Sequence, residues 1–205
     1  MDVSIRCRCG ALCGSLRRES PNVGFRIVCY CDDCQAFARF LGNEGPILDT
    51  NGGTDIVQLS AARLHITAGA DQLACVRVTP KGLYRWYTRC CRTPIGNTLP
   101  THQAPFVGVI HACIDPGPQS LDDVLGPVSL RVMAKFAVGS LPTRDAHQTF
   151  PLSHVLRLVA SMLGWRLRGD HKHSPFFDAA TGAPVAVPQR YDGATGSPSA
   201  TDTRP

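Results

Sequence analysis

Three cysteines lie within six positions in the segment CYCDDC, at Cys29, Cys31 and Cys34. The spacing Cys-x-Cys-x-x-Cys places three thiols close enough to bind one metal ion. No further cysteine or histidine occurs in the next thirty residues. Structural zinc sites use four protein ligands, whereas catalytic ones often use three and leave the fourth position for water or substrate. The segment therefore predicts a metal centre with one open position.

A second set of cysteines is divided between two short motifs. Cys7 and Cys9 form CRCG, and Cys90 and Cys91 form RCCRTP. A metal held by the first pair needs partners from elsewhere, and the second pair is available across the fold. Zinc is the expected ion at both centres because it accepts thiolates in tetrahedral geometry. The remaining cysteines stand alone and are expected to be buried free thiols.

Composition is consistent with a globular protein that binds metal in a reducing compartment. The 205 residues predict one domain with an extension, and the formal charge is +5. Two thiolate-bound zinc ions would lower that charge to about +2, and the arginines are scattered, so nucleic acid is not expected as a partner. No apolar run is long enough to span a membrane, and no secretory h-region is visible. We expect a cytoplasmic protein, where disulfides do not persist.

Hydrophobic patterning predicts a mainly β fold. Short runs rich in β-branched and aromatic residues fill the first two thirds of the chain, and Gly, Pro or Asn bound them. The segment LACVRVTPKGLYRWYT, residues 73–88, predicts a β-hairpin across the turn at 80–82. Other expected strands are VSIRC, GFRIVCY, DIVQL, RLHIT, FVGVIHACI and SLRVMAKFAV.

One short helix is expected directly after the cysteine triplet, over residues 32–42. Asp32 or Asp33 is expected to cap its start, with a role beside the metal as the alternative, and Gly42 to end it. Cys34 would then lie near a helix N-terminus, where the dipole favours thiolate over thiol.

A longer amphipathic helix is expected over residues 151–169. Its apolar side chains follow the helical repeat at Leu152, Val155, Leu156, Val159, Met162 and Leu163. We expect this face to pack on the β core. The predicted organisation is a zinc-binding β domain over 1–142, a helical extension over 143–192 and a disordered tail over 193–205.

Taken together, CRCGAL, CYCDDCQ and a later Cys-x-Thr resemble the glutathione-dependent formaldehyde-activating enzyme family, which includes centromere protein V. The resemblance covers roughly residues 3–140. It implies a β-tent of small antiparallel sheets with two zinc ions. The first and third motifs would supply the structural ligands Cys7, Cys9 and Cys91. The middle motif, Cys29, Cys31 and Cys34, would form the catalytic centre.

The third motif departs from the family pattern, Cys-x-x-Cys-Gly-Thr. Cys91-Arg92-Thr93 matches its end, but Thr88 stands where the earlier cysteine belongs. Cys90 is the obvious substitute, and Cys13 is a second candidate. Adjacent cysteines share a metal only with an unusual local backbone. The departure indicates a divergent branch of the family.

The resemblance implies a carbon–sulfur lyase that joins glutathione, or a related thiol, to formaldehyde or another small aldehyde. The alternative is a zinc-stabilised β domain that binds a partner and catalyses nothing. An open metal position with room for a thiol distinguishes the first from the second. An iron–sulfur protein is a third possibility, which coloured protein would favour.

Overall fold

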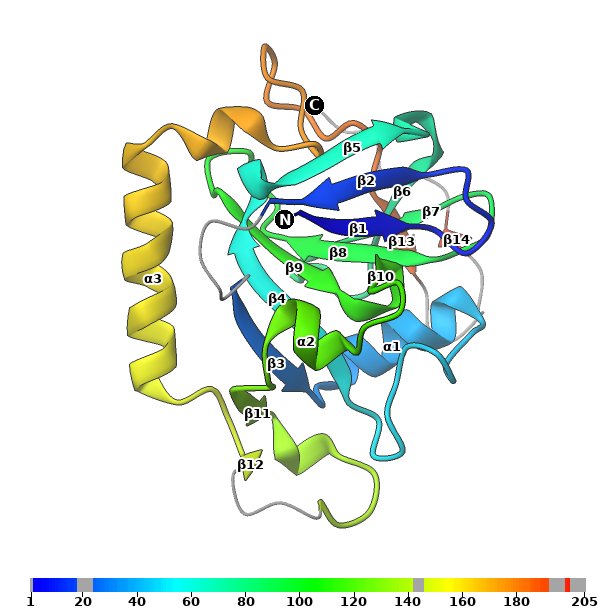
Figure 1. Ribbon diagram of the computed structural model, residues 1–205, viewed down its shortest axis with the longest axis vertical. Helices are drawn as coiled ribbons and strands as arrows, with labels where there is room; N and C mark the ends of the chain where they lie inside the picture. Colours follow the sequence, from blue (N-terminus) through cyan, green and yellow to red (C-terminus); the bar gives the residue numbers. More distant parts are fainter. Residues whose placement is uncertain (1, 18–23, 142–145, 192–197, 200–205) are drawn as a thin grey trace.

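The computed structural model describes residues 2–17, 24–141, 146–191 and 198–199, and it is mainly β, as predicted (Figure 1). Within these residues the strands form two sheets. The smaller sheet is antiparallel throughout. Its four strands, in spatial order, are β10 (Ile114–Asp115), β1 (Val3–Arg6), β2 (Cys13–Leu16) and β5 (Leu64–Ala68).

The larger sheet has ten strands and is not the small antiparallel sheet that was expected. Its central strands run antiparallel, but β11 lies parallel to β3 and to β12, and β13 lies parallel to β6. All three parallel pairings involve segments that join a sheet edge late in the chain. In spatial order the strands are β12 (Ala146–His147), β11 (Leu130–Val132), β3 (Phe25–Cys29), β4 (Thr54–Ser60), β9 (Phe106–Ile110), β8 (Pro94–Thr98), β7 (Tyr84–Thr88), β6 (Leu73–Arg77), β13 (Gln189–Tyr191) and β14 (Pro198–Ser199).

The described α-helices are α1 (Asp32–Leu41), α2 (Leu121–Leu125) and α3 (Leu152–Leu167). Short 3-10 turns connect strands at η1 (Ala61–Arg63), η2 (Ala70–Gln72), η3 (His111–Cys113), η4 (Ala134–Phe136) and η5 (Asp170–His173). The run FVGVIHACI was expected to be one strand. It bends at η3 instead, so that its two ends join different sheets. In the described part of the chain, no helix is both long and apolar enough to cross a membrane.

Hydrophobic clusters lie on both faces of the larger sheet. Along β6 the alternation expected from sequence is confirmed, because Leu73 and Cys75 join one cluster while Ala74 and Val76 join the other. The predicted hairpin is confirmed by the antiparallel pairing of β6 with β7. The aromatic strand β7 thus lies between two apolar layers.

The C-terminal extension contributes to the same core. Phe176 is fully buried and stacks on Trp86 with ring centroids 4.8 Å apart, and Phe177 stacks on Tyr84 at 6.2 Å. The C-terminal extension therefore shares a core with the β strands. The predicted boundary at residue 142 stays a prediction. The predicted disordered tail lies outside the described residues, except for β14, which pairs with β13.

Helix α1 was predicted within one residue of its observed bounds, and Gly42 ends it in the left-handed conformation. Its N-cap, however, is Cys31, which makes no capping side-chain bond. The prediction that Asp32 or Asp33 caps the helix is therefore wrong. Both carboxylates lie in the first turn, where they face the positive end of the helix dipole.

Helix α3 was predicted correctly in extent but not in orientation. None of its residues is buried, and its apolar face is directed away from the sheets. In Figure 1 it runs along the outside of the molecule. The sequence pattern locates an apolar face but does not say what covers it. Here the half-buried side of the helix carries both polar and apolar side chains, among them His154, Leu158, Ser161 and Trp165.

Candidate metal centres

Four cysteines from two connections meet at one point. Cys7 and Cys9 lie between β1 and β2, whereas Cys90 and Cys91 lie between β7 and β8. Their sulfur atoms all lie within 4.8 Å of one another. The Sγ–Sγ separations are 3.5 Å for Cys7–Cys9, 3.8 Å for Cys7–Cys90, 3.3 Å for Cys9–Cys90 and 3.7 Å for Cys90–Cys91.

These separations suit one metal ion. Sulfur atoms bound tetrahedrally at about 2.3 Å lie about 3.8 Å apart. Surrounding groups also favour thiolates: the Leu12 N–H donates to Cys7 Sγ at 3.2 Å. Burial alone would raise the pKa of Cys91, but hydrogen bonds from Thr93, Thr88 and Cys9 outweigh burial and lower that pKa to about 5. The four-cysteine cluster could therefore hold a metal ion.

The turn after Cys91 shows how adjacent cysteines reach one site. Arg92 has a left-handed φ of 55°, a conformation that normally favours glycine. The backbone at this position therefore has a shape that glycine adopts without strain, although the residue is arginine. Arg92 is held there through contacts with Phe40, whose carbonyl accepts from Nη2 and whose ring lies 4.8 Å from the guanidinium carbon. Cys13 is not part of the cluster, and its Sγ lies 3.3 Å from the Gly10 carbonyl oxygen instead.

The second cluster consists of Cys29, Cys31 and Cys34. They lie at the end of β3, at the N-cap of α1 and in its first turn. Their sulfur atoms all lie within 4.8 Å of one another, with Cys31 and Cys34 3.2 Å apart. Among the residues that the structure describes, no histidine, carboxylate or fourth cysteine joins this group. The three-cysteine cluster could hold a metal ion and would leave it incompletely coordinated by the described chain.

Burial and charge differ among the three thiols. Cys29 and Cys34 are buried, and Cys31 is half-buried. Hydrogen bonds from Cys29 and Cys31 lower the pKa of Cys34 well below its ordinary value, and Arg85 adds to this effect against the opposing effect of burial. Hydrogen bonds with Cys31 and Cys34, together with burial, raise the pKa of Cys29. One negative charge is therefore favoured at Cys34 before any metal binds.

Arg85 is a site residue that the sequence reasoning missed. It is fully buried within β7, where Nη1 lies 3.6 Å from Cys34 Sγ and Nη2 lies 3.5 Å from an Asp33 carboxylate oxygen. Burial would lower the pKa of Arg85, but the electrostatic attraction of the neighbouring Cys34, Cys31 and Asp33 side chains outweighs burial, so that the pKa is raised. The available signal was a charged residue inside the apolar strand LYRWYT. Asp33 pairs with this cation instead of capping the helix.

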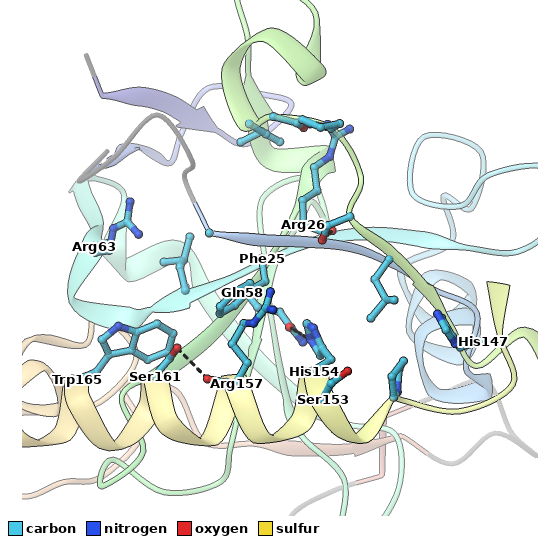
Figure 2. Close-up of a pocket in the computed structure, with 18 residues that line it drawn as sticks. Phe25, Arg26, Gln58, Arg63, His147, Ser153, His154, Arg157, Ser161 and Trp165 are labelled. Carbon is cyan, nitrogen blue, oxygen red and sulfur yellow. Dashed lines mark hydrogen bonds between the residues drawn. The ribbon is translucent and has the colours of Figure 1, made fainter. Parts of the chain in front are cut away.

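A larger cavity lies elsewhere, between α3 and the strands β3 and β4 (Figure 2). Its volume is about 600 Å³, and its walls carry Arg26, His147, His154, Arg157 and Trp165. Cys7 lines a second cavity of about 320 Å³ near Thr93. Neither of these two cavities, nor two others around the described residues, is lined by the three-cysteine cluster.

Comparison with known proteins identifies a protein family and similar solved structures. A family of unknown function, DUF6151, matches residues 1–188. A crystal structure of a Rhodobacter sphaeroides protein matches with a TM-score of 0.41 and 19% identity, covering 61% of this chain and 96% of that one. No curated protein matches the chain. The resemblance to the formaldehyde-activating family therefore stays a prediction.

Proposed function

The chain belongs to the DUF6151 family, and we propose that it is a zinc-dependent enzyme of the carbon–sulfur lyase type. Its substrates would be glutathione or a related small thiol, and formaldehyde or another small aldehyde. The observation that carries the proposal is the three-cysteine cluster, Cys29, Cys31 and Cys34, which has no fourth ligand among the described residues. Three protein ligands leave one position for a substrate thiol.

Zinc is the proposed ion at both clusters because it prefers soft thiolates and tetrahedral coordination. Four thiolates around Zn²⁺ suit a structural role at Cys7, Cys9, Cys90 and Cys91. Three thiolates around Zn²⁺ carry a net charge of about −1. Arg85, buried 3.6 Å from Cys34 Sγ, supplies the matching positive charge. A buried cation is costly without such a partner, which supports a thiolate cluster at this point.

The proposed reaction is an addition that needs no oxidant or reductant. The thiol sulfur forms a bond to the aldehyde carbon, the C=O double bond becomes a C–O single bond, and the thiol proton ends on that oxygen. When bound, zinc supplies positive charge that favours thiolate over thiol. The half-buried carboxylate of Asp33 lies 3.5 Å from Arg85 Nη2, next to Cys34 in the chain, and it is the group proposed to take the thiol proton and pass it to the aldehyde oxygen. Arg85 fixes the orientation of that carboxylate.

The test is adduct formation followed by NMR, with zinc-loaded protein, glutathione and formaldehyde. We expect the protein to speed formation of S-hydroxymethylglutathione above the spontaneous rate. Cys31→Ser should abolish the acceleration, and Cys75→Ser is the matched control, because Cys75 is buried outside both clusters. Equal rates with and without the wild-type protein would contradict the proposal.

A non-catalytic binding domain is the second candidate function. Two observations favour it: Cys29 and Cys34 are buried, and none of the four cavities described above reaches them. Such a domain would hold two zinc ions and show no response to a thiol. Iron bound to the three-cysteine cluster would colour the protein and favour the iron–sulfur alternative.

A further inference from the structure

An apolar stripe runs the whole length of α3 on its solvent side. Five side chains form it, with exposed fractions of 71% for Leu152, 61% for Leu156, 56% for Val159, 60% for Leu163 and 81% for Leu167. We refer to these five residues as the α3 seam. Surface helices of globular proteins normally turn such a stripe toward the core. An exposed row of large apolar side chains along one helix face is a candidate interaction site.

Contacts on the opposite side of α3 fix this orientation (Figure 2). The His154 ring lies 2.8 Å from the side-chain oxygen of Gln58 and packs edge-on against Phe25. The guanidinium of Arg157 lies over the same Phe25 ring, 5.9 Å from its centroid. Beyond the helix, Ser60 donates to Asp170 at 2.7 Å. Rotating the seam inward would break these contacts and place leucines against Gln58 and the Arg26 region.

The rest of the chain offers no apolar segment to cover the seam. Residues 18–23, 142–145, 192–197 and 200–205 together contain one Leu, Ile, Val, Met or aromatic residue, Val23. These segments therefore do not match the apolar length of the seam, whereas a second α3 helix does.

We propose that the seam binds the α3 helix of a second copy of this chain, with the two helices antiparallel about a twofold axis. The spacing of the seam carries this inference. Leu152, Leu156 and Val159 are followed in mirror order by Ala160, Leu163 and Leu167. An axis beside Val159 and Ala160 therefore places Leu156 opposite Leu163 of the second copy, and Leu152 opposite Leu167. The same patch complements itself, as a twofold interface requires.

Charge is compatible with this pairing. The charged residues of α3 are Arg157 and Arg166. Arg157 is directed to Phe25 on the inner side. The antiparallel register places Arg166 beside Ser153 of the second copy and not beside another arginine. Like charges therefore do not meet across the interface.

The size of the seam indicates a reversible dimer. A fully exposed leucine side chain presents roughly 100 Å² of apolar surface. The seam then supplies on the order of 300 Å² per copy and 600 Å² per pair, against about 1,200 Å² for a standard stable interface. We expect a weak dimer that exchanges with the monomer and is populated by millimolar concentration.

The first test is sedimentation equilibrium of the full zinc-loaded chain over a range of concentrations. Val159→Glu places two carboxylates near the axis and should weaken dimerisation at least 100-fold. Val187→Glu is the matched control, since Val187 is a similarly exposed valine outside the helix, and its dimerisation should be unchanged. A wild-type protein that stays monomeric at millimolar concentration would overturn the proposal. So would a protein that binds anionic vesicles without self-association.

A charge pair tests the antiparallel arrangement. Leu156→Glu and Leu163→Lys should each weaken dimerisation alone. The double variant should regain at least tenfold in dimer affinity, because the antiparallel register places residue 156 opposite residue 163 of the second copy. In a parallel pair, residue 156 would lie opposite residue 156 of the second copy, so that like charges meet. The double variant would then dimerise more weakly than either single variant. Circular dichroism confirms that each variant keeps its folded monomer.

Discussion

The left-handed backbone conformation at Arg92 predicts which of two substitutions there, by Gly or by Ala, gives the more stable protein. An L-residue in this region costs about 1–2 kcal/mol, which glycine avoids. Glycine in turn loses about 0.5–1 kcal/mol more chain entropy on folding than alanine. Replacing Arg92 by Ala or Gly removes the same contacts with Phe40. We therefore expect Arg92→Gly to be more stable than Arg92→Ala by about 0.5–1 kcal/mol.

Both variants should be less stable than the wild type. The lost cation–π contact is worth about 0.5–1 kcal/mol at an exposed site. The lost hydrogen bond to the Phe40 carbonyl is worth about 1 kcal/mol. Arg92→Ala should therefore lower the free energy of unfolding by about 1.5–2 kcal/mol. Arg92→Gly should lower it by about 1 kcal/mol, because release of the backbone strain offsets part of the loss.

The assay is urea unfolding of zinc-loaded protein, with metal content checked in every variant. Arg39 provides the matched control, since it is an exposed arginine in the last turn of α1. There the order should reverse, with Arg39→Ala more stable than Arg39→Gly by about 1 kcal/mol. Alanine at least as stable as glycine at both positions would refute the argument that the backbone at Arg92 is strained.

Three further predictions concern the metal sites, the helix and the core. Cys9→Ser should destabilise the whole fold, because a structural metal contributes folding free energy. Cys31→Ser should lose one metal ion per chain and remain folded by circular dichroism. Equal loss of stability in both variants would contradict the division of roles. Burial and Arg157 lower the pKa of His154, so the unfolded chain binds a proton at this histidine more readily than the folded one, and stability should fall as pH drops below about 6.5. Urea unfolding of His154→Gln should show a shallower pH dependence than the wild type. An unchanged pH dependence would count against this assignment. Phe176→Ala should lower the free energy of unfolding, measured with urea, by about 3–5 kcal/mol, and Val187→Ala should leave it almost unchanged. Equal small effects from both would show that the extension does not share the core.

Local sequence signals predicted the elements that build the two clusters. Cysteine spacing found both sets of residues that the structure brings together, and turn and helix signals located the hairpin over 73–88 and the helix that starts after Cys31. These features depend on residues close in the chain. The fourth member of the first cluster was harder to predict, because Cys90 and Cys91 approach Cys7 only through a tertiary contact and an unusual φ at Arg92.

Features that depend on packing between distant segments were missed or mistaken. Arg85 lies 51 positions from Cys34, and only strand pairing brings its guanidinium to the sulfur. The parallel edges of the larger sheet come from late segments with no local signal of their destination. For α3, periodicity found the apolar stripe, but contacts made by His154 and Arg157 decide which side faces the protein.

The most direct test of the central claim is cobalt substitution, read by absorption before and after glutathione is added. We expect two metal ions per chain and a change in the thiolate-to-cobalt bands of one of them. Glutathione should produce that change, and its S-methyl derivative, which has no thiol, should not. Cys31→Ser should remove the responsive band and leave the other. Two ions whose spectra ignore glutathione would contradict an open thiol-binding position at Cys29, Cys31 and Cys34.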